Sequence, residues 1–222
     1  MGRTSLGRNS VRRTRRVIVQ PQDNVSADVR AGLISSRTNR ERHRHYVQSS
    51  PGTCGATATA LANREDADLF ISLHVNASPN IDARGIETYY LDNTTDEAAI
   101  RLAARENATS RKNISDLQFI LSDMMQNMKL EDSITLAHRL QTSLVSGMSK
   151  FMGEVKDLGV KKALFHVLVG ARMPSILVEM FFITNQTESR VMVDASYQEA
   201  MVNALFEGIQ KYAQSNLMAK TL

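Results

Sequence analysis

Two residues of this sequence carry a reactive side chain at the end of an apolar run. His74 ends the run LFISLH at residues 69–74, and Glu179 follows the run ILV at residues 176–178. A short uninterrupted apolar run is typical of a strand that is covered on both faces, as in a parallel sheet flanked by helices. Sites in such sheets form just beyond the carboxyl ends of the strands. An imidazole and a carboxylate at one edge would begin a metal-assisted hydrolase site.

Both residues also have ordinary structural interpretations. A lone histidine is more often a hydrogen-bonded structural residue than a ligand, and Glu179 would need no role if it simply emerged into solvent. Burial of an unpaired carboxylate is costly, however, so a glutamate within an apolar strand needs a partner or a function. The residues alone leave these alternatives open.

The surrounding sequence predicts alternating strands and helices. Apolar runs predict strands at residues 17–19, 69–76, 87–91, 164–169 and 174–179. Apolar residues at three- and four-residue steps predict two helices within residues 113–151, with a break near Lys129, and a closing helix at residues 197–212. Another helix is expected after Thr94, which has the spacing of a capping box with Glu97. The fold class is therefore α/β, a three-layer domain whose mostly parallel central sheet has helices on both faces.

The composition fits one such domain with an unusual N-terminal quarter. The chain has 222 residues, a single cysteine and no run near the ~20 apolar residues of a membrane helix. Residues 1–50 carry 11 Arg, no Lys and three acids, whereas the remainder carries 16 basic and 20 acidic side chains. A nucleic-acid partner is not favoured, because no aromatic interleaving or nucleic-acid motif accompanies the charge. We expect residues 1–60 to be disordered or poorly docked and residues 216–222 to be a tail, and no signal peptide is visible.

Five segments beyond residue 60 share their order with a known enzyme family. They read ANREDADLFISLHVNAS, GIETYYL, DEAAIRLAARENAT, KDLGVKKALFHVLVGARMPSILVEMFFITNQTES and YQEAMVNALFEGIQKY. Together they resemble the zinc-dependent N-acetylmuramoyl-L-alanine amidases of the type 3 family, which cut peptidoglycan. The resemblance is much more specific than the short motif SLHVN alone. It implies a catalytic domain over residues 61–215.

The resemblance implies a role for both residues singled out above. His74 matches the family's last zinc histidine and Glu179 matches its catalytic glutamate, with Zn²⁺ as the cofactor. The substrate would be peptidoglycan, cut at the amide bond between N-acetylmuramic acid and L-alanine. Residues 113–151 occupy the place of an insertion that covers the zinc site in division-associated amidases until partner proteins displace it. An activator protein at this segment is therefore one interpretation and plain core packing is the other. The implied location is the periplasm or the cell wall.

The family's other two zinc ligands have no match in this sequence. They are a histidine in a loop after the first strand and a glutamate on the next helix, yet the loop position here reads QPQDN at residues 20–24. Asp23, His43 and His45 are the remaining donors nearby, and we do not expect them to bind the metal. Three explanations stay open: a reading-frame error that scrambled residues 1–60, an inactive peptidoglycan-binding or regulatory module, and an unusual ligand set.

Overall fold

A six-stranded sheet with the strand order β2-β1-β3-β6-β4-β5 runs through the computed structural model, which describes residues 15–21, 43–47, 55–109 and 129–219. The strands are β1 (Arg15–Pro21), β2 (His43–Val47), β3 (Leu69–Asn76), β4 (Ile86–Leu91), β5 (Asp157–Ala163) and β6 (Ser175–Phe182). The helices are α2 (Gly55–Arg64), α3 (Glu97–Glu106), α5 (Leu130–Met152), α6 (Gln186–Val191) and α7 (Ala195–Ala219), with a 3-10 helix, η3, at His166–Leu168. Neighbouring strands are parallel except for β4 and β6, so the predicted mostly parallel sheet is confirmed.

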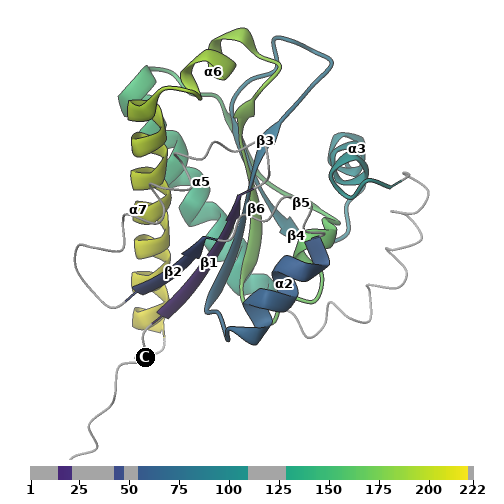
Figure 1. Cartoon of the computed structure of the whole chain (residues 1–222), viewed down its shortest axis with the longest axis vertical. Helices are drawn as coiled ribbons and strands as arrows, with labels where there is room; N and C mark the ends of the chain where they lie inside the picture. Colours follow the sequence, from purple (N-terminus) through teal and green to yellow (C-terminus); the bar gives the residue numbers. More distant parts are fainter. Residues whose placement is uncertain (1–14, 22–42, 48–54, 110–128, 220–222) are drawn as a thin grey trace, which may run out of the picture.

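The sheet lies between two helical layers (Figure 1), as predicted. One core joins Ile71 and Leu73 of β3 to Leu140 of α5 and Leu205 of α7. The other core joins Phe70 of β3 to the small side chains of α2 and α3. Successive residues of a strand point to opposite faces, so β3 buries alternate side chains in the two cores. Both faces of β3 are therefore covered, which explains the uninterrupted apolar run in its sequence.

The strand predicted at residues 164–169 is not formed. The strand of this region is β5, which ends at Ala163. Leu164, Phe165 and Leu168 of this segment are nevertheless buried in the core beside α3. Asn107, just after α3, donates from its side-chain amide to Leu164 O at 2.7 Å and accepts from His166 N at 2.8 Å. These hydrogen bonds tie the segment to α3 instead of to a strand. A short apolar run thus signalled burial correctly and secondary structure wrongly.

The N-terminal cap of α3 also differs from the prediction. The helix begins at Glu97, and Asp96 is its N-cap, whose carboxylate accepts from Ala98 N at 2.8 Å and Ala99 N at 3.4 Å. Thr94 instead accepts a hydrogen bond from Asp96 N. The capping residue is therefore two positions later than expected, although the predicted helix is present.

Helix α5 accounts for the second half of the helical segment predicted at residues 113–151. The side chains of Leu136, Leu140, Leu144 and Met148 along one face are completely buried. A buried amide, Gln141, also joins α5 to β4, because it donates to Ile86 O and accepts from Thr88 Oγ1. Residues 130–152 are therefore an integral layer of the domain, as core packing predicts. The first helix predicted in the segment lies outside the described residues.

The N-terminal strands are part of the same sheet, although residues 1–60 were expected to be poorly organised. Strand β1 pairs in parallel with β3 on one side and with β2 on the other. The side chains of Val17, Ile18 and Val19 are buried. The sheet therefore continues across residue 60, and the rest of residues 1–54 lies outside the described ranges.

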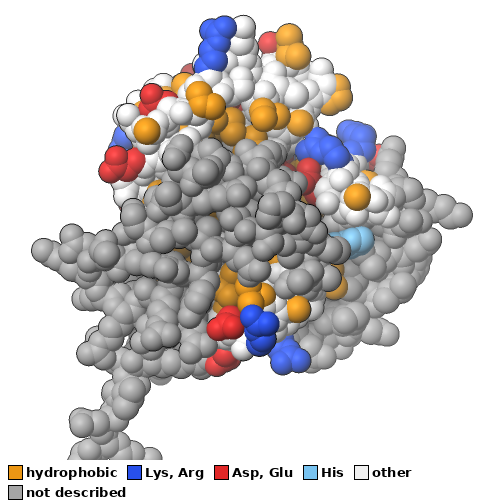
Figure 2. All heavy atoms as spheres, in the orientation of Figure 1, with side chains coloured by type: hydrophobic (Ala, Val, Ile, Leu, Met, Phe, Trp, Pro, Cys, Tyr) orange, Lys and Arg blue, Asp and Glu red, His pale blue; other side chains and the backbone are white. Residues whose placement is uncertain are grey.

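The surface has a mixed character where its side chains are described. Figure 2 shows apolar side chains among charged ones at the end of the molecule that carries α6 in Figure 1. The large exposed apolar residues are Ile81, Phe151, Ile183 and Val193. Within the described ranges, no helix is both long enough and apolar enough to cross a bilayer.

Candidate metal centre

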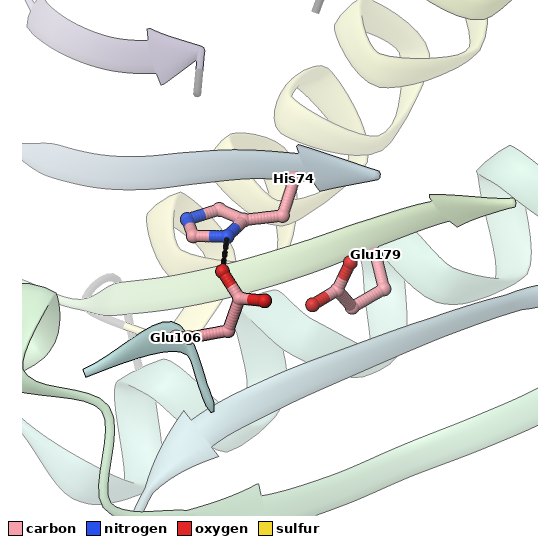
Figure 3. A group of neighbouring side chains, drawn as sticks. All are labelled: His74, Glu106 and Glu179. Carbon is pink, nitrogen blue, oxygen red and sulfur yellow. Dashed lines mark hydrogen bonds and ion pairs between the residues drawn. The ribbon is translucent and has the colours of Figure 1, made fainter. Parts of the chain in front are cut away.

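His74 lies near the carboxyl end of β3, and its ring is held by hydrogen bonds at both nitrogens. Nδ1 is 3.0 Å from Oε2 of Glu106, and Nε2 is 2.9 Å from the hydroxyl of Ser72. Ser72 precedes His74 by two residues and therefore lies on the same face of the strand. The ring is almost buried, with 8% of the residue exposed. Its orientation is thus fixed by a residue of its own strand and by a carboxylate from α3 (Figure 3).

Glu179 lies directly beside His74 on the neighbouring strand β6. The two residues are register partners, but the next pair joins Asn76 to Phe182, so β6 contains an extra residue. Within this bulge Phe181 has a φ of 67°, a left-handed conformation that is rare for an aromatic residue. Bulges often lie next to active sites, where they re-aim a side chain. Here the register shifts immediately after the His74–Glu179 pair.

A buried carboxylate from α6 fixes the chain after this bulge. Glu188 accepts from Phe182 N and from Gly85 N, both at 2.8 Å. Burial raises the pKa of Glu188 to about 7, although these two backbone donors oppose the shift. Gly85 has a φ of +116°, and a Cβ there would lie 2.3 Å from Lys156 O, so only glycine fits. The start of β4 and the end of β6 are thus held together by one side chain.

The third member of the site is Glu106, the last residue of α3. Its Oε2 faces His74, and its Oε1 accepts from Nε of Arg105 at 3.1 Å. Only 9% of the Glu106 side chain is exposed. Helix α3 packs on the sheet through Leu102 and Ala103. This packing places the carboxylate of Glu106 near the end of β3. Figure 3 shows Glu106 approaching the two strand residues from the helical layer.

Glu179 is fully buried, and neither of its carboxylate oxygens has a hydrogen-bond partner among the residues that the structure describes. Burial raises its pKa well above the ordinary value, and the negative charges of Glu106 and Glu87 raise it further. The positive charge of Arg105 acts in the opposite direction. A carboxylate buried in this way is costly unless it carries a proton or meets a cation.

His74, Glu106 and Glu179 together form a group that could hold a metal ion. Each contributes one possible ligand atom, and these atoms lie within 4.8 Å of one another. Imidazole nitrogen and carboxylate oxygen are donors that zinc accepts. The unpaired oxygens of Glu179 fit this interpretation, because a cation nearby would offset the burial of its charge. The donor chemistry and the electrostatics therefore both suit a divalent metal.

The N-terminal histidines lie far from this group, as judged from the backbone. His45 is level with Val17 on β1, which is in turn level with Leu69 on β3. His74 is five residues further along β3, a separation of about 16 Å along the strand direction. His43 is still more distant. Strand β1, by contrast, ends at the same edge as His74, since Pro21 is the register partner of Leu73.

Sequence reasoning found two of the three residues. It singled out His74 and Glu179 and expected them at one edge of the sheet, and they are adjacent there. It missed Glu106, although this residue lies within the segment DEAAIRLAARENAT that supported the resemblance. The only local signal was a glutamate on the last turn of an amphipathic helix. Asp23 lies outside the described residues.

Comparison with known proteins agrees with the fold. The family model described as N-acetylmuramoyl-L-alanine amidase matches residues 24–211. The chain therefore belongs to this family of cell-wall amidases. The amidase AmiA of Escherichia coli K12 is 30% identical over 161 residues, which cover 68% of this chain and 54% of AmiA. The chain thus spans about half the length of this curated relative.

Solved structures show that the fold is shared over almost the whole chain. The N-acetylmuramoyl-L-alanine amidase from Clostridium difficile 630 has a TM-score of 0.64 and 21% identity, and the match covers 91% of this chain and 98% of that one. The CwlD amidase from Clostridioides difficile, solved in complex with the GerS lipoprotein, has a TM-score of 0.52 and 17% identity. That match covers 90% of this chain and 99% of CwlD. At these identities the likeness concerns the fold alone.

Proposed function

We propose that this protein hydrolyses the amide bond between N-acetylmuramic acid and L-alanine in peptidoglycan, with Zn²⁺ as its cofactor. Membership of the amidase family supports the reaction class. The observation that carries the proposal is the buried, unpaired carboxylate of Glu179 beside His74 and Glu106. Burial of the Glu179 carboxylate without a cation costs folding free energy, and a functional requirement explains why the residue is present.

In this proposal His74 and Glu106 hold the metal and Glu179 moves the proton. Zinc, when bound, polarises the scissile carbonyl and lowers the pKa of water. Glu179 accepts a proton from the attacking water at a carboxylate oxygen and delivers it to the leaving amide nitrogen. Its raised pKa suits both steps, because the same group must take up a proton and then release it. The products are the lactyl carboxylic acid of the sugar and a stem peptide with a free amino group.

Ser72 has a supporting role in the same scheme. Its hydroxyl lies 2.9 Å from Nε2 of His74, the ring nitrogen that faces away from Glu106. A hydrogen bond at that nitrogen fixes the tautomer and the ring plane while Nδ1 faces the site. The histidine would thus be oriented in advance, without any movement of the strand.

The first experiment is the zinc content of the purified chain after dialysis against metal-free buffer, followed by an assay of stem-peptide release from peptidoglycan. We expect about one zinc per chain, lost in His74→Ala and kept in the double variant His43→Ala/His45→Ala. The double variant is a matched control, because both residues belong to β2 and are level with residues of β1 far from His74 along the strand direction. Loss of zinc in the control, or retention in His74→Ala, would contradict the assignment.

A second candidate function is a catalytically inactive module that binds peptidoglycan. It is favoured by the number of ligands, since a catalytic zinc usually has three protein ligands and an open position. Apart from Glu179, the described residues of the group supply only His74 and Glu106. Sedimentation with insoluble peptidoglycan without release of stem peptides would support this candidate over the enzyme.

We also propose that the protein acts in the periplasm or at the cell wall, where peptidoglycan is found. The catalytic unit would comprise residues 61–215 together with β1 and β2, because these strands complete the sheet. The family match, which begins at residue 24, includes β2. An activator protein that docks at residues 113–151 is part of the same proposal. The complex of CwlD with the GerS lipoprotein shows that a structural neighbour assembles with another protein.

A further inference from the structure

A row of ionisable side chains crosses three adjacent strands at the level of the candidate metal centre, and a lysine of a fourth strand, two register positions further along, continues it. His74 of β3 is the register partner of Glu179 of β6, and Glu179 is the register partner of Glu87 of β4. Glu87 in turn forms an ion pair with Lys161 of β5, with Oε2 and Nζ 2.6 Å apart. Lys161 belongs to the edge strand, the most distant strand of this row. The row therefore extends from the site to the margin of the sheet.

Glu87 is connected to the site by hydrogen bonds that bypass Glu179. Its Oε1 accepts from the side-chain amide of Asn76 at 2.8 Å. The Oδ1 of Asn76 accepts from Nη2 of Arg105 at 3.0 Å and from the backbone N–H of Ala77 at 2.8 Å. These contacts use both ends of the Asn76 amide, so they fix which way it faces. Asn76 therefore links the two residues: its amide is hydrogen-bonded to Glu87 at one end and to Arg105 at the other.

Arg105 completes the connection to Glu106. Its Nε donates to Oε1 of Glu106, while Oε2 of the same carboxylate faces His74. Its Nη1 donates to the carbonyl of Ala77 at the end of β3. A guanidinium held at three points has little freedom, so it sets the plane of the carboxylate that it binds. The orientation of Glu106 therefore depends on Arg105.

We propose that the Lys161–Glu87 pair positions the metal centre through Asn76 and Arg105. All four are positioning residues, since none of them belongs to the metal-binding group. Loss of the Lys161 cation would leave Glu87, whose side chain is only 6% exposed, as an uncompensated buried charge that must move or take up a proton. Either response disturbs the Asn76 amide and, through Arg105, the carboxylate of Glu106. This inference rests on the proposed zinc site and extends it to residues of β4 and β5.

The test compares Lys161→Met with Lys162→Met in the full chain. Lys162 is the adjacent residue of β5 and also forms an ion pair, with Asp92 at 3.0 Å, so it is a matched control. Zn²⁺ affinity is measured by competition with a chromophoric chelator. We expect Lys161→Met to weaken binding about tenfold, as the loss of a partner outside the ligand shell does, and Lys162→Met to leave it unchanged. Thermal unfolding verifies that both variants are folded.

A double variant separates positioning from general damage. Glu87→Gln/Lys161→Met removes both charges but keeps a side-chain carbonyl that can accept from Asn76. We expect it to bind Zn²⁺ more tightly than Lys161→Met alone, whereas independent effects would add. Equal affinity of Lys161→Met and wild type, or additive losses in the double variant, would overturn the inference.

A second readout does not depend on the metal. The Nε–H resonance of Arg105 in ¹H–¹⁵N spectra reports its bond to Glu106, and we expect it to shift or broaden in Lys161→Met but not in Lys162→Met. An unchanged resonance in Lys161→Met would overturn the inference even if the wild type held no zinc. Absence of zinc from the wild type, with the expected change of the resonance, would refute the proposed function and leave the positioning network intact.

Discussion

The two sides of the sheet contribute to this protein in different ways. Strands β3, β6 and β4 carry ionisable side chains at one level, from His74 to Glu87, and Lys161 of β5 pairs with Glu87 from two register positions further along. The side chains described on β1 are Val17, Ile18 and Val19, which are all apolar and buried. One side of the sheet thus provides the chemical groups, whereas the described part of the other side provides apolar packing.

This difference shows that the residues that form the site and the residues that form the sheet need not occupy the same part of the chain. The resemblance to amidases was recognised beyond residue 60, where the chemical groups lie. The sheet nevertheless extends across that boundary, because β1 pairs with β3 from Val17 to Pro21. The carboxyl end of β1 also reaches the edge where His74 lies. Strand β1 therefore belongs to the same sheet as the site, although its described side chains provide no metal ligand.

The largest effect is expected for Glu179→Gln, on the side that carries the chemistry. Removal of the proton acceptor should lower the rate of stem-peptide release by about 10³-fold, within the range known for general bases. The matched control is Glu199→Gln, a change of the same kind at an exposed position of α7. A Glu179→Gln variant with more than a tenth of the wild-type rate would show that another group takes the proton.

Val19→Ala tests whether the other side of the sheet belongs to the same cooperative unit. Val19 is 3% exposed, and removal of two buried methyl groups should lower the free energy of unfolding by about 2 kcal/mol. Chemical denaturation measures the change. Val193→Ala is the control, because Val193 is 78% exposed and should contribute almost nothing. An equally small effect at Val19 would mean that β1 is not part of the cooperative core.

Metal-free protein should lose stability as the pH rises from about 4.5 to 7. Glu179 and Glu188 both have raised pKa values in the folded state, and that of Glu188 is about 7. The folded state then binds more protons than the unfolded state in this range, so its stability falls as these protons are lost. Unfolding in the presence of a chelator measures the effect.

Glu179→Gln provides the comparison for this pH dependence. The neutral side chain should make the metal-free protein about 2 kcal/mol more stable than wild type at pH 8, since folding of the wild type must either bury the carboxylate charge or take up a proton that the unfolded state does not hold. The advantage should disappear near pH 4, where the wild-type carboxyl is protonated in both states. A constant difference between the two proteins across this range would contradict the assignment of the titration to Glu179.

The smallest effect is expected for Asp96→Ala, which removes the N-cap of α3. Loss of the two backbone hydrogen bonds should cost about 1 kcal/mol of stability, as measured by thermal or chemical unfolding. Thr94→Ala is the control and should have a smaller effect, because the N-cap carboxylate of Asp96 accepts from two helical N–H groups, whereas the Thr94 hydroxyl accepts from Asp96 N. The reverse order would restore Thr94 as the capping residue.

Much of the fold could be predicted from local patterns. The run LFISLHVN indicated a strand at residues 69–76, and β3 has these bounds because the run reports burial on both faces. The same logic predicted a strand that ends at Glu179, whereas β6 continues to Phe182. It failed at residues 164–169, where an equally apolar run is held by Asn107 and forms a 3-10 turn. Apolar residues report that a segment is buried, but not which hydrogen bonds it makes.

The complete site depended on tertiary structure. The sequence determined that His74 and Glu179 end apolar runs, and parallel strands bring such ends to one edge. Which strands are neighbours was decided by the sheet order, which places β6 between β3 and β4. Glu106 reaches His74 because α3 packs on the sheet, and Lys161 reaches Glu87 because β5 pairs with β4. Residue types and spacing therefore specified the groups within each strand, whereas packing between distant segments decided which groups meet.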